Sequence, residues 1–156
     1  MDTVHIDWGE GVIRFDSIGK ANISRLDEKG FYAILGAVYN SEKKYWENLK
    51  LLYVGQAFDQ TLRERIPQEH SAYECAFDYQ RKHSGVGIVV MLGTIKNSIV
   101  EKLTQQFFDD IECCLVYCNR PLCNTSCQET YTGRTLMIIN EGNYSPLKEE
   151  CDCSEK

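Results

Sequence analysis

Two apolar runs separated by a polar segment constrain the fold of this chain more than any other feature. Residues 31–39 and 51–55 are rich in aromatic and aliphatic side chains, whereas residues 40–50 between them are mostly polar. Aromatic and β-branched side chains are enriched in strands, and a polar segment between two strands is typical of a hairpin. We therefore expect two antiparallel strands joined by a long loop, which brings the ends of the two runs together.

Three helices are expected around this pair of strands. They cover residues 60–66, residues 67–83 with Gly85 as terminator, and residues 98–118. In the third segment, apolar residues recur at steps of three and four, which is the pattern of an amphipathic helix. Pro at the first helical position and Gly just past the last one are common helix boundaries.

Further strands complete the predicted sheet. A buried strand is expected over residues 86–95, edge strands over residues 11–16 and 21–26, and a final hairpin over residues 128–131 and 134–139. These elements predict the α+β class, with a small, mainly antiparallel β-sheet flanked by helices, amino-terminal strands and a carboxy-terminal hairpin.

The length of 156 residues suits one domain with a core of its own. We expect that domain over residues 1–140, with its core at about residues 30–127, and a polar, flexible tail over residues 141–156. The amino terminus has no basic region and no long apolar run. We therefore expect a cytoplasmic protein that makes no membrane contact.

The formal net charge of −6 limits how the chain could hold nucleic acid. Proteins that grip a duplex usually place Lys and Arg along a groove, since phosphate neutralisation supplies most of the binding free energy. An acidic total still allows a local basic strip. It indicates a short contact footprint, a divalent ion in the site, or a partner that brings the substrate.

The eight cysteines allow three interpretations. An even count is consistent with a disulfide framework, which would need an oxidising compartment. Thiolates a few residues apart can also ligate a structural Zn²⁺ ion, and Cys114, Cys118, Cys123 and Cys127 form such a set. The third interpretation treats Cys114 and Cys118, one helical turn apart, as small buried apolar residues.

Two short motifs, Gly30-Phe31-Tyr32 and Tyr53-Val54-Gly55, occur in this order, and Arg63 follows the second tyrosine by ten residues. Glu112 lies further on in the amphipathic segment, and Asn124 follows it. The order, the spacing and the expected secondary structure resemble the GIY-YIG nuclease family. The resemblance covers residues 30 to about 127.

This resemblance implies a metal-dependent endonuclease that hydrolyses DNA phosphodiester bonds with one Mg²⁺ or Mn²⁺ ion. It implies that Glu112 binds the ion, that Tyr32 is the general base, and that Tyr53 positions the water or the phosphate. It also implies that Arg63 stabilises the pentacoordinate phosphate and that Asn124 braces the site.

Two features depart from the family pattern. Many members carry a histidine one helical turn after the arginine, where this chain has Pro67, and the nearest histidine is His70. The hairpin loop is also long, and its Lys43, Lys44 and Trp46 combine cations with a stacking surface. These three residues are candidates for contact with the substrate, and His70 is the candidate for the displaced histidine.

Each site residue also has an ordinary structural interpretation. Tyr32 and Tyr53 could be sheet aromatics, and Glu112 a surface carboxylate. Arg63 could be a solvated charge, and Arg65 serves as its control: replacing Arg63 should reduce cleavage far more. A second hypothesis is a non-catalytic nucleic-acid- or protein-binding module that retains the fold. A homodimer or a protein partner is compatible with both hypotheses.

Overall fold

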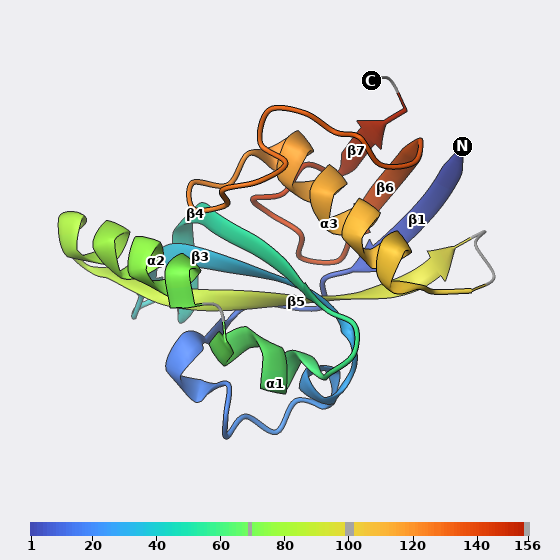
Figure 1. Ribbon diagram of the computed structural model, residues 1–156. Coiled ribbons are helices and arrows are strands. Elements are labelled where there is room, and N and C mark those ends of the chain that lie inside the picture. Colours follow the sequence, from blue (N-terminus) through green and yellow to red (C-terminus); the bar gives the residue numbers. More distant parts are fainter. Residues whose placement is uncertain (69, 99–101, 155–156) are drawn as a thin grey trace.

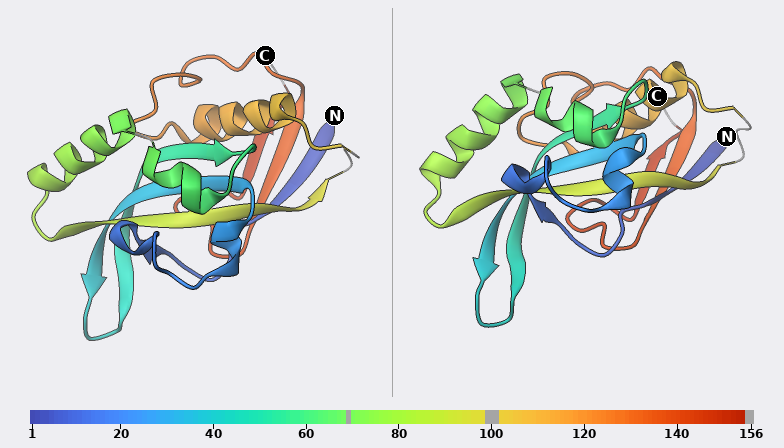
Figure 2. Two further views of the ribbon diagram at one scale, coloured as in Figure 1. Left: turned by 60° about the horizontal axis from the view of Figure 1, so that its bottom comes forward. Right: turned by 90° about the horizontal axis from the view of Figure 1, so that it is seen from below.

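The computed structural model describes residues 1–68, 70–98 and 102–154 of the chain (Figure 1). It has the α+β class that the sequence predicts, with a curled mixed sheet and helices on both of its faces (Figure 1 and Figure 2). Within the described residues, no helix is long and apolar enough to cross a membrane.

The two apolar runs form the central hairpin of the sheet. β3 (Gly30–Asn40) and β4 (Tyr45–Ala57) pair antiparallel, as the sequence predicts. The connection between them is shorter than expected, because most of residues 40–50 belong to the two strands and only residues 41–44 turn. The hairpin therefore extends well beyond the body of the sheet (Figure 2).

One long strand, β5 (Val86–Ser98), belongs to both halves of the sheet. Its first part pairs with β3 and its last part with β1 (Asp2–Asp7), both antiparallel. β6 (Leu136–Glu141) lies parallel to β1, and β7 (Glu150–Cys153) pairs antiparallel with β6. The order in the described chain is β4-β3-β5-β1-β6-β7, and the short β2 (Ile13–Arg14) also pairs with β5.

Side-chain caps fix where two of the helices begin. α1 (Leu62–Arg65) follows Thr61, whose hydroxyl accepts from the Glu64 N–H, while the Glu64 carboxylate accepts from the Thr61 N–H. α3 (Gln105–Asn119) follows Thr104, whose hydroxyl accepts from a backbone N–H of the first turn at 3.1 Å. The third helix is therefore shorter than predicted, because residue 98, its expected start, still belongs to β5.

The central strand β3 separates two apolar cores. Phe31 faces α3, where its ring stacks on Phe108 with centroids 4.7 Å apart. Tyr32, the next residue, faces α1 and α2 (His70–Lys82). Alternate strand residues point to opposite faces, so each face of β3 is covered by its own helices. Figure 1 shows α3 and α1 on opposite sides of β5.

The amino-terminal segments differ from the prediction. Of residues 11–16, only Ile13–Arg14 form a strand, followed by a 3₁₀ turn. Residues 21–26 lead into a second 3₁₀ turn, η2 (Ser24–Asp27), instead of forming an edge strand. The main amino-terminal strand is β1, which lies inside the sheet because both β5 and β6 pair with it.

The carboxy-terminal segment also differs from the prediction. Residues 128–131 form no strand in the described structure, and β6 pairs with β1 and β7 instead of closing a local hairpin. Residues 141–156 were expected to be loose, yet β7 belongs to the sheet and buries Cys151 and Cys153. Cysteines alternate with acidic residues there, so the acidic composition conceals a strand whose inner face is apolar.

The buried Asn140 connects the two ends of the chain. Its side chain accepts from Trp8 Nε1 at 2.8 Å and donates to the Lys148 carbonyl at 2.8 Å. Asn140→Ala should lower the free energy of unfolding by about 2–3 kcal/mol, because the buried Trp8 N–H loses its acceptor and the Lys148 carbonyl loses its donor. Denaturant unfolding measures the change. Asn22→Ala, at an exposed position, is the control, and an equal loss in both variants would contradict this role.

Candidate functional site

A cavity of about 460 Å³ lies at the outer edge of the sheet, beside β4. Its walls come from β4, α2, α3 and residues 122–127. Tyr53, Glu112 and Asn124, three residues that the sequence singled out, all line it. Residues from both helical layers can meet there because β4 is the last strand of its half of the sheet.

Residues 122–124 close the outer edge of β4. The backbone N–H of Leu122 donates to the Leu51 carbonyl at 3.4 Å, and that of Cys123 to the Leu52 carbonyl at 2.6 Å. Asn124 continues the ladder with its side chain, which accepts from the Val54 N–H and donates to the Val54 carbonyl, both at 2.9 Å. Asn124 thus binds the backbone of β4 at Val54, the residue that follows Tyr53.

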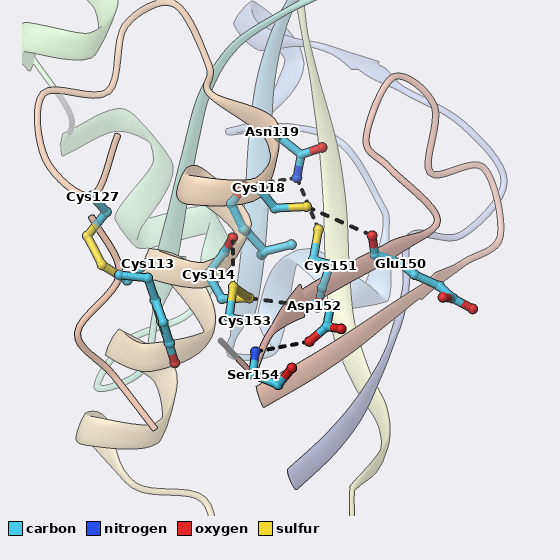
Figure 3. Close-up of a disulfide and its surroundings, with 12 residues drawn as sticks. Cys113, Cys114, Cys118, Asn119, Cys127, Glu150, Cys151, Asp152, Cys153 and Ser154 are labelled. Carbon is cyan, nitrogen blue, oxygen red and sulfur yellow. Dashed lines mark hydrogen bonds between the residues drawn. A yellow bond between two sulfur atoms is a disulfide. The ribbon is translucent and has the colours of Figure 1, made fainter. Parts of the chain in front are cut away.

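Two disulfides tie both helices to the same loop. Cys75–Cys123 links α2 to the segment beside β4. Cys113–Cys127, which Figure 3 draws, links α3 to the end of the loop. All four cysteines line the cavity. A cross-link restricts the unfolded chain and holds the joined elements together, so these bonds fix the width of the cavity.

Glu112 stands between this cavity and a second hollow of about 250 Å³. Arg65 and Gln56 line the second hollow with it. Asp109, one helical turn before Glu112, accepts from Gln56 Nε2 at 2.5 Å and from Gln105 Nε2 at 2.8 Å. The two carboxylates therefore lie on the same face of α3, and both reach the larger cavity.

The two arginines of α1, Arg63 and Arg65, have different surroundings. Arg63 donates to Asp27 Oδ1 at 3.0 Å and to the carbonyls of Ile18 at 2.8 Å and Ala21 at 2.9 Å. Its hydrogen bond keeps the pKa of Asp27 below the ordinary value. The resemblance assigns Arg63 to the phosphate, whereas in the structure its guanidinium holds the amino-terminal 3₁₀ segments against α1. Arg65 lines the hollow with Glu112.

Tyr32 lies in the core beneath the second motif. Its side chain is fully buried, and its ring is 6.2 Å from the ring of Tyr53. The phenol occupies the space where a Cβ of Gly55 would lie, and the Gly93 carbonyl occupies the corresponding space at Gly30. The glycines of both motifs are therefore required by close packing.

Three further candidates lie at the tip of the β3–β4 hairpin, and His70 belongs to α2. His70 is the first residue of α2, and its side chain is outside the described part of the structure. Lys43, Lys44 and Trp46 belong to the tip of the hairpin, where Trp46 packs against Tyr39 with centroids 5.1 Å apart. Seven strand positions separate Trp46 from Tyr53, which is about 23 Å at 3.3 Å per residue.

The cysteines proposed for zinc are not grouped around one point. Cys114 is bonded to Cys153, and Cys123 and Cys127 are bonded to two other partners. Sulfur atoms in disulfides are not thiolates, the form that ligates zinc. Among the described residues, no group of three or more His, Cys, Asp or Glu side chains is placed to hold a metal ion.

No protein-family model, curated protein or solved structure matches the chain. The chemistry of the site therefore follows from its own residues. It combines two carboxylates on α3, a tyrosine and an amide on β4 and its edge, and an arginine in the adjoining hollow. Carboxylate oxygens suit a hard divalent cation, and a guanidinium suits a phosphate.

Sequence reasoning missed several residues that shape this site. Asp109 could have been found from its spacing, because a residue three before Glu112 shares its helix face. Arg65 could not have been found in this way, because α1 has only four residues and its sequence does not show which face is apolar. Cys75 and Cys123 are 48 residues apart, so only the even cysteine count pointed toward their pairing.

The packing of Tyr32 on Gly55 gives a direct test. Gly55→Ala should destabilise the fold by about 1–3 kcal/mol, because its Cβ must displace a fully buried tyrosine ring. Thermal or denaturant unfolding measures the loss. Gly11→Ala is the control, since a Cβ at Gly11 meets nothing within 4 Å. Two variants of equal stability would show that the glycine is not required for packing.

Proposed function

We propose that the protein is a metal-dependent endonuclease that hydrolyses DNA phosphodiester bonds with a single Mg²⁺ or Mn²⁺ ion. The observation that carries this proposal is that Tyr53, Glu112 and Asn124 line one cavity although they are far apart in sequence. The ordered motifs that resemble the GIY-YIG nuclease family support the same function. Arg65 in the adjoining hollow supplies the positive charge that a phosphate needs.

The donor set fits one hard cation. Glu112 would hold it through a carboxylate oxygen, and Asp109 on the same helix face adds negative charge to the cavity. Such a site needs no third protein ligand, because water and phosphate oxygens complete the coordination. When bound, the ion would offset charge on the phosphate and favour deprotonation of a water.

The protein side chains would orient the substrate around this charge. Tyr53, half-buried in the cavity wall, can hydrogen-bond a phosphate oxygen or the attacking water. Asn124 fixes the backbone of β4 next to it. Tyr32 fills the core behind Gly55, so we propose for it a positioning role through Tyr53. Arg65 takes the phosphate-stabilising role that the resemblance assigned to Arg63.

The hairpin tip could extend the contact with DNA. Tyr39 and Tyr45 expose 42% and 43% of their surface, and the Lys43 ammonium lies 5.9 Å from the ring of Tyr45. Trp46 is half-buried against Tyr39, so its role is to support this surface. Lys44 adds a second cation beside them. We propose that the hairpin tip contacts a DNA strand at a point about 23 Å from the cavity.

The disulfides favour an oxidising compartment. Such bonds persist in secreted or periplasmic proteins and are rare in the cytosol, where thiols are kept reduced. Three of them form among the described residues. We therefore infer that the protein works where disulfides are stable, in place of the cytoplasmic location expected from the amino terminus.

Glu112→Gln tests the site, because it removes the charge that would hold the cation. The variant should fold normally and lose Mg²⁺- or Mn²⁺-dependent cleavage by at least about a hundredfold. Cleavage of branched, nicked, single-stranded and duplex DNA is measured with each ion and with a chelator. Glu129→Gln, which makes the same charge change at an exposed position, should cleave normally.

Two outcomes would reject the proposal. A Glu112→Gln variant as active as the wild type would exclude the cavity as the site. Wild-type protein that binds DNA saturably but cleaves no form with any divalent ion would favour the non-catalytic binding module instead.

The two arginines of α1 should separate stability from activity. Arg63→Ala removes a charged donor from two carbonyls, which should cost about 1–3 kcal/mol of folding free energy and leave the cleavage rate of the folded protein almost unchanged. Arg65→Ala should lower that rate by about tenfold to a hundredfold with a smaller change in melting temperature. If Arg63→Ala lowered the cleavage rate more than Arg65→Ala, Arg63 and not Arg65 would be the phosphate-binding residue.

A further inference from the structure

Four cysteines lie between α3 and β7, away from the cavity. Cys114 and Cys118 are one turn apart on α3, and Cys151 and Cys153 alternate on β7 (Figure 3). Cys114 is bonded to Cys153, with Cα atoms 6.1 Å apart. Cys118 and Cys151 carry the two thiols that remain among the described cysteines.

The Cys118–Cys151 pair is in register with the bonded Cys114–Cys153 pair. Four residues along a helix advance about 6 Å, and two residues along a strand advance about 7 Å. Moving from Cys114 to Cys118 therefore covers nearly the same distance as moving from Cys153 back to Cys151. The Cys118 and Cys151 side chains accordingly lie next to each other, one turn of α3 beyond the Cys114–Cys153 bond (Figure 3).

The two thiols differ in exposure. Cys118 is partly exposed, whereas Cys151 is fully buried. Cys118 Sγ lies 3.9 Å from the Glu150 carbonyl oxygen, and Asn119 Nδ2 lies 3.5 Å from Cys151 Sγ. Cys118 is therefore the thiol that a reagent in solution can reach, and Cys151 is held directly behind it.

The two thiols also differ in acidity. The neighbouring Cys151 thiol, which can donate to the thiolate, lowers the pKa of Cys118 to about 7. The charge of Lys148 acts in the same direction, while burial and Asp152 oppose them. The neighbouring Cys118 and burial raise the pKa of Cys151. A thiol that is exposed and partly ionised near neutral pH attacks disulfides efficiently.

We propose that Cys118 and Cys151 form a redox-active pair that reacts with low-molecular-weight disulfides and closes as a fourth disulfide between α3 and β7. Cys118 is the attacking residue and Cys151 the resolving one. This inference does not depend on the nuclease proposal, because neither residue lines the cavity.

Glutathione disulfide illustrates the balance of the reaction. The Cys118 thiolate attacks one sulfur, the glutathione S–S bond breaks, and one glutathione thiolate leaves as a protein–glutathione disulfide forms. Cys151 then loses its proton to solvent and attacks the Cys118 sulfur, and the second glutathione leaves. Two electrons pass from the protein thiols to glutathione disulfide, which becomes two glutathione molecules.

Thiol counting on the wild-type protein tests the closure. Protein purified without reductant is incubated with glutathione disulfide, acid-quenched, denatured and alkylated for mass spectrometry. The number of alkylated cysteines should fall from two to none. Cleavage after Tyr117, Leu122 and Leu147 and before Asp152 separates Cys118 and Cys151 from the other cysteines. It should yield residues 118–122 disulfide-linked to residues 148–151. Persistence of two thiols, or linkage of either residue to another cysteine, would overturn the proposal.

Two serine variants test the order of the steps. Cys151→Ser should stop with one glutathione bound to Cys118, because the resolving thiol is missing. Cys118→Ser should take up glutathione at least about tenfold more slowly, since Cys151 is buried. Melting curves establish that both variants are folded. Equal uptake by the two variants would reject the assigned roles, and the wild-type result stands independently of both.

Discussion

The burial of β3 on both of its faces dictates where the rest of the molecule can lie. Phe31 packs against α3 and Tyr32 against α1 and α2, so neither face of the strand is open to a ligand. A site built from both layers must then form at an edge of the sheet. β4 provides that edge, because its other side pairs with β3 and its outer side is covered only by residues 122–124 in the described structure. The cavity lies where that cover meets the two helices.

Disulfide bonds hold the loop beside β4 and the last strand in place. The loop that closes the cavity contains few apolar residues, yet disulfides from both helices and the amide of Asn124 hold it on β4. The Cys114–Cys153 disulfide joins the last strand, β7, to α3. Cys118 and Cys151 on the same two elements carry free thiols, which we propose form a further disulfide. α3 is therefore the element on which both proposals meet, with a cation site on one face and a thiol pair on another.

Sequence patterns predicted the elements whose signal is local. The hairpin, the strand after Gly85 and the amphipathic third helix all occur, and three of the residues singled out for chemistry line one cavity. The errors fall where pairing is long-range. β1 is held in the sheet by backbone pairing with β5 and β6, which are distant in sequence. β7 is held there by pairing with β6. The helix predicted from residue 98 begins at Gln105, because β5 continues through the expected first turn.

The sequence by itself determined the α+β class and the central antiparallel pair, since strand alternation acts over a few residues. The close packing at Gly30 and Gly55 was decided by the sheet, because the Gly93 carbonyl and Tyr32 that fill those spaces belong to neighbouring strands. Only the tertiary structure decided which arginine of α1 lines the hollow beside Glu112. Two residues along a helix differ by about 200° in direction, so Arg63 and Arg65 point to opposite sides. A helix of four residues has no apolar stripe from which its orientation could be inferred. The cysteine pairs were decided in the same way, because each depends on elements brought together by the whole sheet.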